Sequence, residues 1–218
     1  VIATKVGNQW RPDGSGWDWN PSKGYILQAV EESLKRLQTD YIDLYQLHGG
    51  TIDDPIDETI EAFEQLKQEG KISYYGISSI RPNVIREYVK RSNIASVMLQ
   101  YSLLDRRPEE EVLGLLLQHQ VGVLARGSLA QGLLAGKMAK PYLGYTSEQV
   151  QQVSRAATAS DAIRYVVQHP AVSSAVLGIR TGAHLHDTLT FAQAPPLKPQ
   201  ELERLQALLP ANQYEQHR

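Results

Sequence analysis

The sequence predicts an α/β protein, a (β/α)8 barrel of which this chain supplies roughly strands 3 to 8 and a C-terminal helix. Strand-sized apolar runs alternate with helical segments along the whole chain. The glycine-rich dinucleotide turn G-x-G-x-x-G is absent, which disfavours the open doubly wound sheet that has the same alternation. No linker, low-complexity tract or run of charge divides the chain, so residues 1–218 are expected to form a single domain.

The expected strands are continuous apolar runs rather than alternating ones, which is typical of parallel strands covered on both faces. They are Val1–Val6, Tyr41–His48, Ile72–Ser78, Ala95–Tyr101, Val121–Arg126 and Ser173–Gly178. A barrel of about 250 residues uses roughly 31 residues per strand–helix unit. Because six units are counted here, about two units, some 60 to 70 residues, are expected before Val1.

The helices between these strands are expected from their caps. The first begins with Asn20 as N-cap and Pro21 at the first helical position. The second begins near Asp54-Pro55 and ends at Gly70, a plausible left-handed cap. The later helices begin at Pro82 and after Pro108, and span Ser160–Gln168, Ala183–Phe191 and Pro199–Leu209.

Composition narrows the function classes. A formal net charge of −2 provides no basic field for nucleic acid or an anionic membrane, so a small-molecule ligand is the expected partner. With no cysteine the chain has no disulfide, no thiolate nucleophile and no cysteine-based metal site, and no metal is expected. No apolar run approaches the roughly 20 residues that span a bilayer. These features predict a soluble, cytoplasmic protein.

The candidate site residues are the last polar residues of the apolar runs, because a barrel assembles its site at the C-terminal ends of its strands. A lone lysine or histidine at a strand end is more often structural. Their shared topological position nevertheless favours a common site, since packing alone does not require it. The candidates are Lys5, His48, Ser78, Ser79, Gln100, Arg126, and Gly178 leading to Arg180.

Five segments in order resemble consecutive signatures of the aldo-keto reductases, and the resemblance extends from Val1 to about Leu209. The segments are Ala3–Gly7, Asp40–His48, Tyr75–Ser79, Leu99–Ser102 and Ala130–Lys137. The stretches His48–Thr59, Ser78–Asn83 and Tyr214–Arg218 are most similar to bacterial NADPH-dependent members related to general stress reductases. The resemblance implies one barrel domain of this family over residues 1–218.

The resemblance also implies a reaction, in which hydride passes from NADPH to the carbonyl of an aldehyde or ketone. In the family a tyrosine protonates the developing alkoxide, helped by a lysine, an aspartate and a histidine. By motif match, Lys5 corresponds to that lysine and His48 to that histidine. An ammonium lowers the pKa of a nearby phenol, and an imidazole can polarise a carbonyl.

The family's aspartate and tyrosine belong to its first two strand–helix units, and none of the 11 tyrosines of this chain lies in a comparable motif. We therefore expect these 218 residues alone to be inactive. Either these residues are the later part of a longer chain, which we favour, or the protein is a truncated and inactive relative of the family. Two further classes stay open, which are a nicotinamide-binding module without useful turnover, similar to channel-associated β subunits, and a barrel that binds neither cofactor nor substrate. The oligomeric state is open, and a monomer is possible.

By the same resemblance, the cofactor NADPH contacts three groups of residues. Ser78, Ser79 and Gln100 fall where the family holds the nicotinamide carboxamide, although Asn is more usual at the second position. The loop over the pyrophosphate contains Ser128, Leu129 and Gln131. Arg126 replaces the tyrosine or tryptophan that many members stack on the nicotinamide, so it either stacks or reaches the pyrophosphate.

The 2′-phosphate of NADPH is expected after the last strand, where Gly178 leads to Arg180, with His184 four residues further on. Arg180 is the one permanent cation of this segment, and an arginine at a helix N-terminus can bind a phosphate bidentately. The other reading is a solvated arginine at a helix start. The walls of a substrate pocket are expected from Trp10, Trp17 and Trp19, which share one loop.

Overall fold

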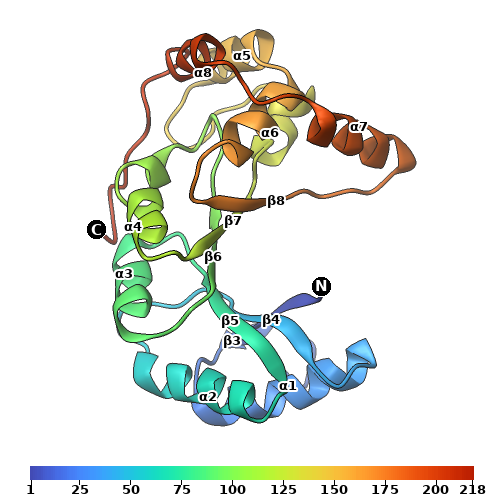
Figure 1. Ribbon diagram of the computed structural model, residues 1–218, viewed down its shortest axis with the longest axis vertical. Coiled ribbons are helices and arrows are strands. Elements are labelled where there is room, and N and C mark those ends of the chain that lie inside the picture. The colour runs from blue at the N-terminus through green and yellow to red at the C-terminus, as the bar shows by residue number, and fades with distance from the viewer. The chain divides into compact units, whose positions relative to one another are not determined.

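The computed structural model describes all of the residues Val1–Arg218, and they form two compact units (Figure 1). The N-terminal unit comprises residues 1–98, 119–121 and 216–218. The C-terminal unit comprises residues 99–118 and 122–215. Each unit pairs parallel strands with helices that follow them in sequence, which is the α/β pattern that the alternation predicts.

Parallel strands form the sheet of the N-terminal unit in the order β1-β4-β5-β6. The strands are β1 (Ala3–Val6), β4 (Ile42–Leu47), β5 (Ile72–Ser78) and β6 (Ser96–Gln100), whose last two residues belong to the C-terminal unit. The register places Lys5 opposite Gln46, and Gln46 opposite Gly76. Sequential parallel strands therefore end at one edge, which is where the sequence analysis expects the site.

Three helices accompany these strands: α1 (Lys23–Leu37), α2 (Ile56–Gln68) and α3 (Pro82–Arg91). Helices α1 and α2 lie side by side on one face of β4 and β5 (Figure 1). Phe63 of α2 stacks on Tyr75 of β5, with ring centroids 5.3 Å apart, and meets the edge of Tyr45 of β4 at 5.9 Å. All three rings are buried, so this aromatic group joins the helix layer to the sheet.

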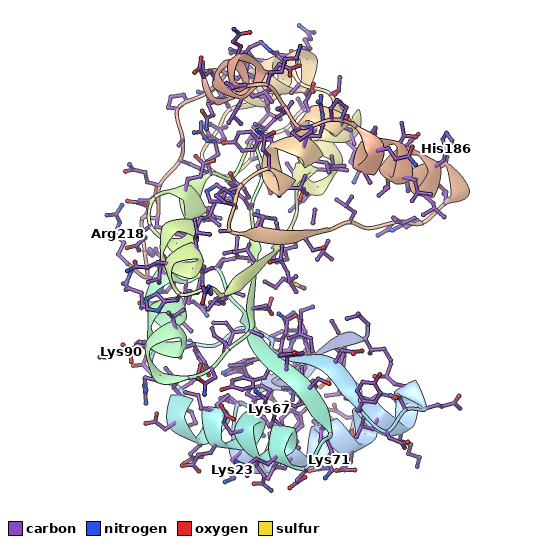
Figure 2. The ribbon with its side chains drawn as sticks, in the orientation of Figure 1. Lys23, Lys67, Lys71, Lys90, His186 and Arg218 are labelled. Carbon is purple, nitrogen blue, oxygen red and sulfur yellow. The ribbon has the colours of Figure 1, made fainter.

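The outer surface of this helix layer is polar. Lys23 of α1 forms an ion pair with Glu61 of α2 at 3.3 Å, and both side chains are well exposed. Figure 2 shows Lys23 together with Lys67 and Lys71 around this layer. Exposed pairs of this kind contribute little to stability, so the buried apolar stripe of each helix decides its position.

Ser22, not Asn20, is the N-cap of α1, which corrects the expected start of that helix. The Ser22 hydroxyl accepts a hydrogen bond from the backbone N–H of Tyr25 (3.4 Å). The Asn20 side chain instead accepts from the backbone N–H and the hydroxyl of Ser22, at 3.1 and 2.7 Å. Asn20 therefore orients the capping residue from two positions away, because an asparagine readily forms such a local turn.

The segment that carries the three tryptophans is a β-hairpin, which the sequence analysis treated as a loop. Strand β2 (Asn8–Trp10) pairs antiparallel with β3 (Trp17–Trp19), and Trp10 lies opposite Trp17. An ion pair of Arg11 with Asp18 at 2.6 Å closes the hairpin at its turn. These strands are only three residues long, too short for a periodic pattern to be visible in the sequence.

In the C-terminal unit, β7 (Gly122–Arg126) pairs in parallel with β8 (Val172–Val176). Its helical segments are η1 (Arg107–Glu109), α4 (Val112–Gln118), η2 (Ala130–Ala135), α5 (Ser147–Ala156), α6 (Ala159–Val167), α7 (Gly182–Gln193) and α8 (Pro199–Gln206). Helices α5 and α8 lie beside each other, and Arg204 of α8 donates to the carbonyl of Ala156 at 2.8 Å (Figure 1). Helix α5 was not anticipated from the sequence.

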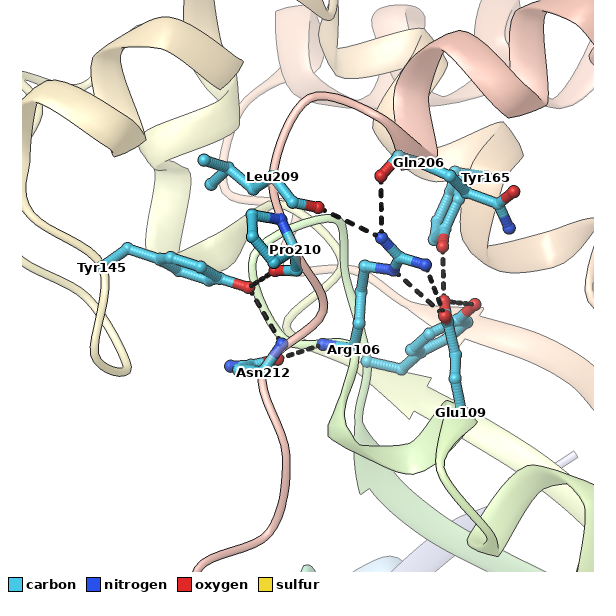
Figure 3. A network of polar contacts seen from close by, with 9 residues as sticks. Arg106, Glu109, Tyr145, Tyr165, Gln206, Leu209, Pro210 and Asn212 are labelled. Atoms are coloured by element: carbon cyan, nitrogen blue, oxygen red, sulfur yellow. Dashed lines mark hydrogen bonds and ion pairs between the residues drawn. The ribbon is translucent and has the colours of Figure 1, made fainter.

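A partly buried polar network supports the C-terminal unit (Figure 3). The Glu109 carboxylate accepts hydrogen bonds from the hydroxyls of Tyr101 (2.9 Å) and Tyr165, and from the guanidinium of Arg106 (2.9 Å). A cavity of about 250 Å³ beside Glu109 is lined also by Tyr101, Tyr165 and His169. The partly buried carboxylate thus has donors from three side chains, which offset the cost of removing its charge from water.

Helix α7 has no buried residue, and Leu185 and Leu189 on it are about half exposed. Figure 2 labels His186 on this exposed helix. Val176 and Ile179, at and after the end of β8, are likewise exposed. No helix of the chain is both long enough and apolar enough to cross a membrane.

All six expected strands are present, and their ends differ from the expected ones by at most two residues. The helix expected over Pro199–Leu209 is α8, which ends earlier, at Gln206. Gly70 has the left-handed backbone (φ 73°) that was expected just past the second helix. The expectation that residues 1–218 form a single domain stays a prediction.

Candidate active site

Lys5 and His48 lie on neighbouring parallel strands of the N-terminal unit. Lys5 is in β1 opposite Gln46, and His48 directly follows β4, where its backbone N–H donates to the carbonyl of Val6 at 2.8 Å. Since alternate residues of a strand face the same side, Lys5, Gln46 and His48 share one face of the sheet. The Nδ2 atom of Asn8 lies 3.5 Å from Nδ1 of His48. The structure thus brings together the two predicted catalytic side chains on one face.

Gln46 is a polar residue of this face that the sequence analysis missed. Its side chain is completely buried, and its amide nitrogen lies 3.4 Å from the carbonyl of Ile77 and 3.5 Å from the hydroxyl of Ser96. Its side-chain oxygen has no hydrogen-bond partner in the structure. A buried, unpaired amide oxygen is costly in a protein core, so this group needs a reason other than stability.

Trp19 covers the ends of β1 and β4. Its indole ring lies so close to Gly7, the residue after β1, that a Cβ atom there would overlap it. The indole N–H donates to the carboxylate of Asp54 (3.0 Å), which also accepts from the backbone N–H of Thr51 (2.7 Å). Asp54 therefore anchors both the tryptophan and the loop after His48, a role that the sequence analysis did not anticipate.

The other two tryptophans lie elsewhere on the hairpin. Trp10 is 72% exposed and Trp17 is 50% exposed, and they face each other across β2 and β3. The hairpin therefore brings Trp19 to the strand ends and leaves the other two rings in contact with solvent. All three stay candidates for the substrate pocket.

Ser78 and Ser79 are both buried at the end of β5. The Ser79 backbone N–H donates to the carbonyl of Met98 on β6 at 3.0 Å, and its hydroxyl accepts from the backbone N–H of Arg81 at 3.2 Å. The Arg81 guanidinium donates in turn to the carbonyl of Gly50. This chain of contacts ties the loop after β5 to the loop after His48.

In the C-terminal unit, the Gln100 side chain is held at both ends. The guanidinium of Arg126 donates to its oxygen at 3.1 Å, and its nitrogen donates to the hydroxyl of Tyr142 at 2.7 Å. Gly127 has a φ of 73°, and a Cβ atom there would lie 3.2 Å from Cγ of Gln100, so glycine lets the chain pass closely. Burial is the main cause of the raised pKa of Tyr142, whose hydroxyl therefore stays protonated.

The loop after β7 combines a buried hydroxyl with a run of left-handed backbone. The Ser128 hydroxyl is buried without a hydrogen-bond partner in the structure. Ala130, Gln131 and Gly132 follow with positive φ values of 46°, 59° and 95°. Leu129 between them is half-buried, and Gln131 is exposed. The backbone N–H groups of Ala130 and Gly132 donate within the loop, to the carbonyls of Gly127 and Leu129 at 2.7 and 2.8 Å. The left-handed run therefore forms a tight turn, and the assignment of these residues to the pyrophosphate stays a prediction.

Arg180 and His184 flank the start of α7, and Gly178 precedes them. Thr181 is the N-cap, and its hydroxyl accepts from the backbone N–H of His184 at 3.1 Å. Gly178, Arg180 and His184 are all exposed. An arginine just before the first turn of a 12-residue helix adds a full positive charge to the positive end of the helix dipole. This arrangement can bind a phosphate monoester.

The predicted residues therefore form two sets, one in each unit. The N-terminal unit holds Lys5, His48, Ser78, Ser79 and the three tryptophans, and the C-terminal unit holds the remaining residues. The structure contains no group of three or more His, Asp or Glu side chains that could hold a metal ion. Gln46, Asp54 and Tyr142 are the neighbours of these sets that were missed, and each contacts its partner over a sequence separation that a motif does not span.

Parallel strands that alternate with helices, with a lysine and a histidine at the ends of two neighbouring strands, define an α/β protein of the barrel type. The family model described as "Aldo/keto reductase family" matches residues 1–210. The chain belongs to the aldo/keto reductase family, whose (β/α)8 barrels share its fold.

Individual relatives agree with this assignment. The chain is 49% identical to the uncharacterized oxidoreductase YqkF of Bacillus subtilis, over the whole of this chain and 76% of that protein. It is 34% identical to the NADH-specific methylglyoxal reductase of Escherichia coli, over 66% of this chain and 47% of that enzyme. The holo form of aldo-keto reductase AKR11C1 from Bacillus halodurans matches with a TM-score of 0.96 and 50% identity, over all of this chain and 75% of that one.

Proposed function

We propose that the protein is an NADPH-dependent carbonyl reductase that acts on a small aldehyde or ketone. The observation that carries this proposal is the shared face of Lys5 and His48 at the ends of two parallel strands, in a chain of the aldo/keto reductase family. That face also carries the buried amide of Gln46, so a polar reaction centre is favoured over a purely packed barrel interior.

NADPH supplies the hydride when it is bound, and the protein's own residues provide position and charge. His48 would donate a hydrogen bond to the carbonyl oxygen and so polarise it. The Lys5 ammonium would hold the pKa of the family's acid tyrosine in a range where the tyrosine can give up its proton. Neither side chain needs to carry the hydride.

The described residues fit the parts of NADPH in turn. Each unit offers candidates for contact with the nicotinamide carboxamide, which are Ser78 and Ser79 in the N-terminal unit and Gln100 in the C-terminal unit, because these side chains offer both donors and acceptors. The loop that contains Ser128, Leu129 and Gln131 would cover the pyrophosphate, as the resemblance to the family implies. Arg180 would pair with the 2′-phosphate.

Arg180 should determine the preference for NADPH over NADH, which differ only in the 2′-phosphate. Arg180→Ala is expected to weaken NADPH binding by about ten- to a hundredfold, since it removes a charge-assisted bond to a phosphate. Its effect on NADH should be small. Fluorescence titration of both cofactors against the wild type and the variant measures this difference, and Arg155→Ala on α5 serves as a charge-matched control.

A reductase that prefers NADH is the second candidate, because one relative is an NADH-specific methylglyoxal reductase. The same titration distinguishes the two. If the wild type binds NADH more tightly than NADPH and Arg180→Ala changes neither affinity, the assignment of Arg180 to the 2′-phosphate is wrong and the second candidate stands.

A further inference from the structure

Gln100 has a fixed side-chain orientation in this structure. A guanidinium only donates hydrogen bonds, so the contact from Arg126 identifies the Gln100 atom that it meets as the oxygen. The other end of the amide must then be the nitrogen, which donates to the Tyr142 hydroxyl at 2.7 Å. Arg126 at the end of β7 and Tyr142 in a later turn thus prevent the amide from flipping.

This clamp leaves half of the amide's hydrogen-bonding capacity for a ligand. A side-chain amide has two lone pairs on oxygen and two N–H groups on nitrogen, and Arg126 and Tyr142 use one of each. One acceptor and one donor remain. A nicotinamide carboxamide carries the same pair of groups, so it can bind the remaining pair reciprocally only while Gln100 keeps its orientation.

We propose that Tyr142 is a positioning residue that fixes the Gln100 amide for recognition of the nicotinamide carboxamide. The proposal rests on the proposed function, in which Gln100 contacts that group. Tyr142 itself touches no reacting atom. Its side chain is buried and its hydroxyl stays neutral, so at physiological pH it always offers the same acceptor to the amide nitrogen.

The turn that carries Tyr142 is anchored separately, by a second tyrosine. Tyr142 and Tyr145 exchange backbone hydrogen bonds of 3.1 and 3.0 Å across a tight turn. The Tyr145 hydroxyl donates to the carbonyl of Pro210 (2.7 Å) and accepts from the backbone N–H of Asn212 (3.1 Å), as Figure 3 shows. Tyr145 therefore holds the turn on the C-terminal segment, whereas the Tyr142 hydroxyl meets only the Gln100 amide.

These two tyrosines provide a matched pair of variants. Tyr142→Phe and Tyr145→Phe each remove one hydroxyl from the same turn, but only the first removes a partner of Gln100. The probe is the 3-acetylpyridine analogue of NADPH, in which a methyl group replaces the amide nitrogen of the carboxamide. The measured quantity is the preference ratio, which is the dissociation constant of the analogue divided by that of NADPH.

In the wild type the preference ratio is expected to exceed 1, because the Gln100 oxygen can accept from the carboxamide but not from the methyl group. Tyr142→Phe should lower the ratio about three- to tenfold, the range of one neutral hydrogen bond. Tyr145→Phe should leave the ratio unchanged and lower the thermal unfolding midpoint. A general loosening of the turn would instead weaken both cofactors equally in both variants.

A double variant separates positioning from direct contact. Gln100→Met should lower the ratio at least as much as Tyr142→Phe, and adding Tyr142→Phe to Gln100→Met should change it no further. If the wild type binds NADPH but Tyr142→Phe keeps the wild-type ratio, the positioning role is overturned while the proposed function stands. If the wild type binds neither NADPH nor the analogue, the proposed function itself fails.

Discussion

Lys5 lies at the end of a strand whose other side chains are apolar or small, opposite a buried glutamine. An apolar strand gains nothing from an ammonium at this position, so the group is there for a partner or for chemistry. In the proposed mechanism that partner is the acid tyrosine rather than the cofactor.

Lys5→Met should reduce turnover by orders of magnitude and leave NADPH affinity within about twofold of the wild type. The substitution keeps the length of the side chain and removes its charge, so the pKa of the acid tyrosine returns toward about 10. Single-turnover rates and cofactor titration measure the two effects separately. Lost NADPH binding together with an unchanged chemical step would show that Lys5 serves the cofactor instead.

At this scale the sequence could predict the residues that end strands but not those that hold them. Lys5 and His48 were found because the strands are easily recognised and their ends have a known geometry. Tyr142 and Asp54 were missed because they act through contacts with Gln100 and Trp19, 42 and 35 residues away in the sequence. Such pairings depend on loop paths that no local pattern encodes.

Among the elements, strands and long helices were predictable and short or locally capped ones were not. The predicted start of α1 was wrong because Asn20 and Ser22 both have side chains that can cap a helix. Only the backbone conformation decides between them. Helix α5 was missed although Thr146 and Gln149 form a capping box at its start. Its buried face consists of Val150 and Val153 only, and the segment before the helix contains several glycines and a proline.

The end of helix α6 should make the C-terminal unit sensitive to acid through His169. Burial is the main cause of the lowered pKa of His169, and the charge of Glu109 opposes it only in part. Its ring meets Tyr101 edge-on at 6.1 Å. Since the unfolded chain binds a proton more readily than the folded one, this contribution to stability is complete above about pH 6.5 and is lost as the pH falls below that value.

The thermal unfolding midpoint of the wild type is therefore expected to fall more between pH 7.5 and 5.5 than that of His169→Gln. The variant retains a polar side chain that cannot take up a proton in this range. His119→Gln, which replaces an exposed histidine, is the control. Equal decreases in the wild type and in His169→Gln would show that His169 does not determine the acid sensitivity.

At the scale of the whole molecule, the chain has fewer strands than a complete barrel. It contributes six parallel strands, whereas a closed (β/α)8 barrel has eight, with linked tilt and stagger. The sequence alone predicted this strand count, because the rhythm of the apolar runs directly reflects the number of strand–helix units.

The fold was therefore predictable from the sequence to a greater extent than the substrate. In the proposed function the carbonyl compound would be selected by loops and by side chains such as Trp10 and Trp17. Their exposure in this structure could not be inferred from their position in a polar segment. Loop aromatics pack inward or remain exposed according to their neighbours, and their chemistry is the same in both cases.

The most direct test of the account is whether hydride passes from the nicotinamide to a carbonyl carbon. The protein, expressed from its complete gene, would be incubated with NADPH deuterated at the transferring position of C4 and a small aromatic aldehyde, and the alcohol would be analysed by mass spectrometry. We expect one deuterium on the carbinol carbon in the wild type, and far less product with Lys5→Met. NADPH binding without any deuterium in an alcohol, across aromatic and short-chain aldehydes, would contradict the assignment as a carbonyl reductase.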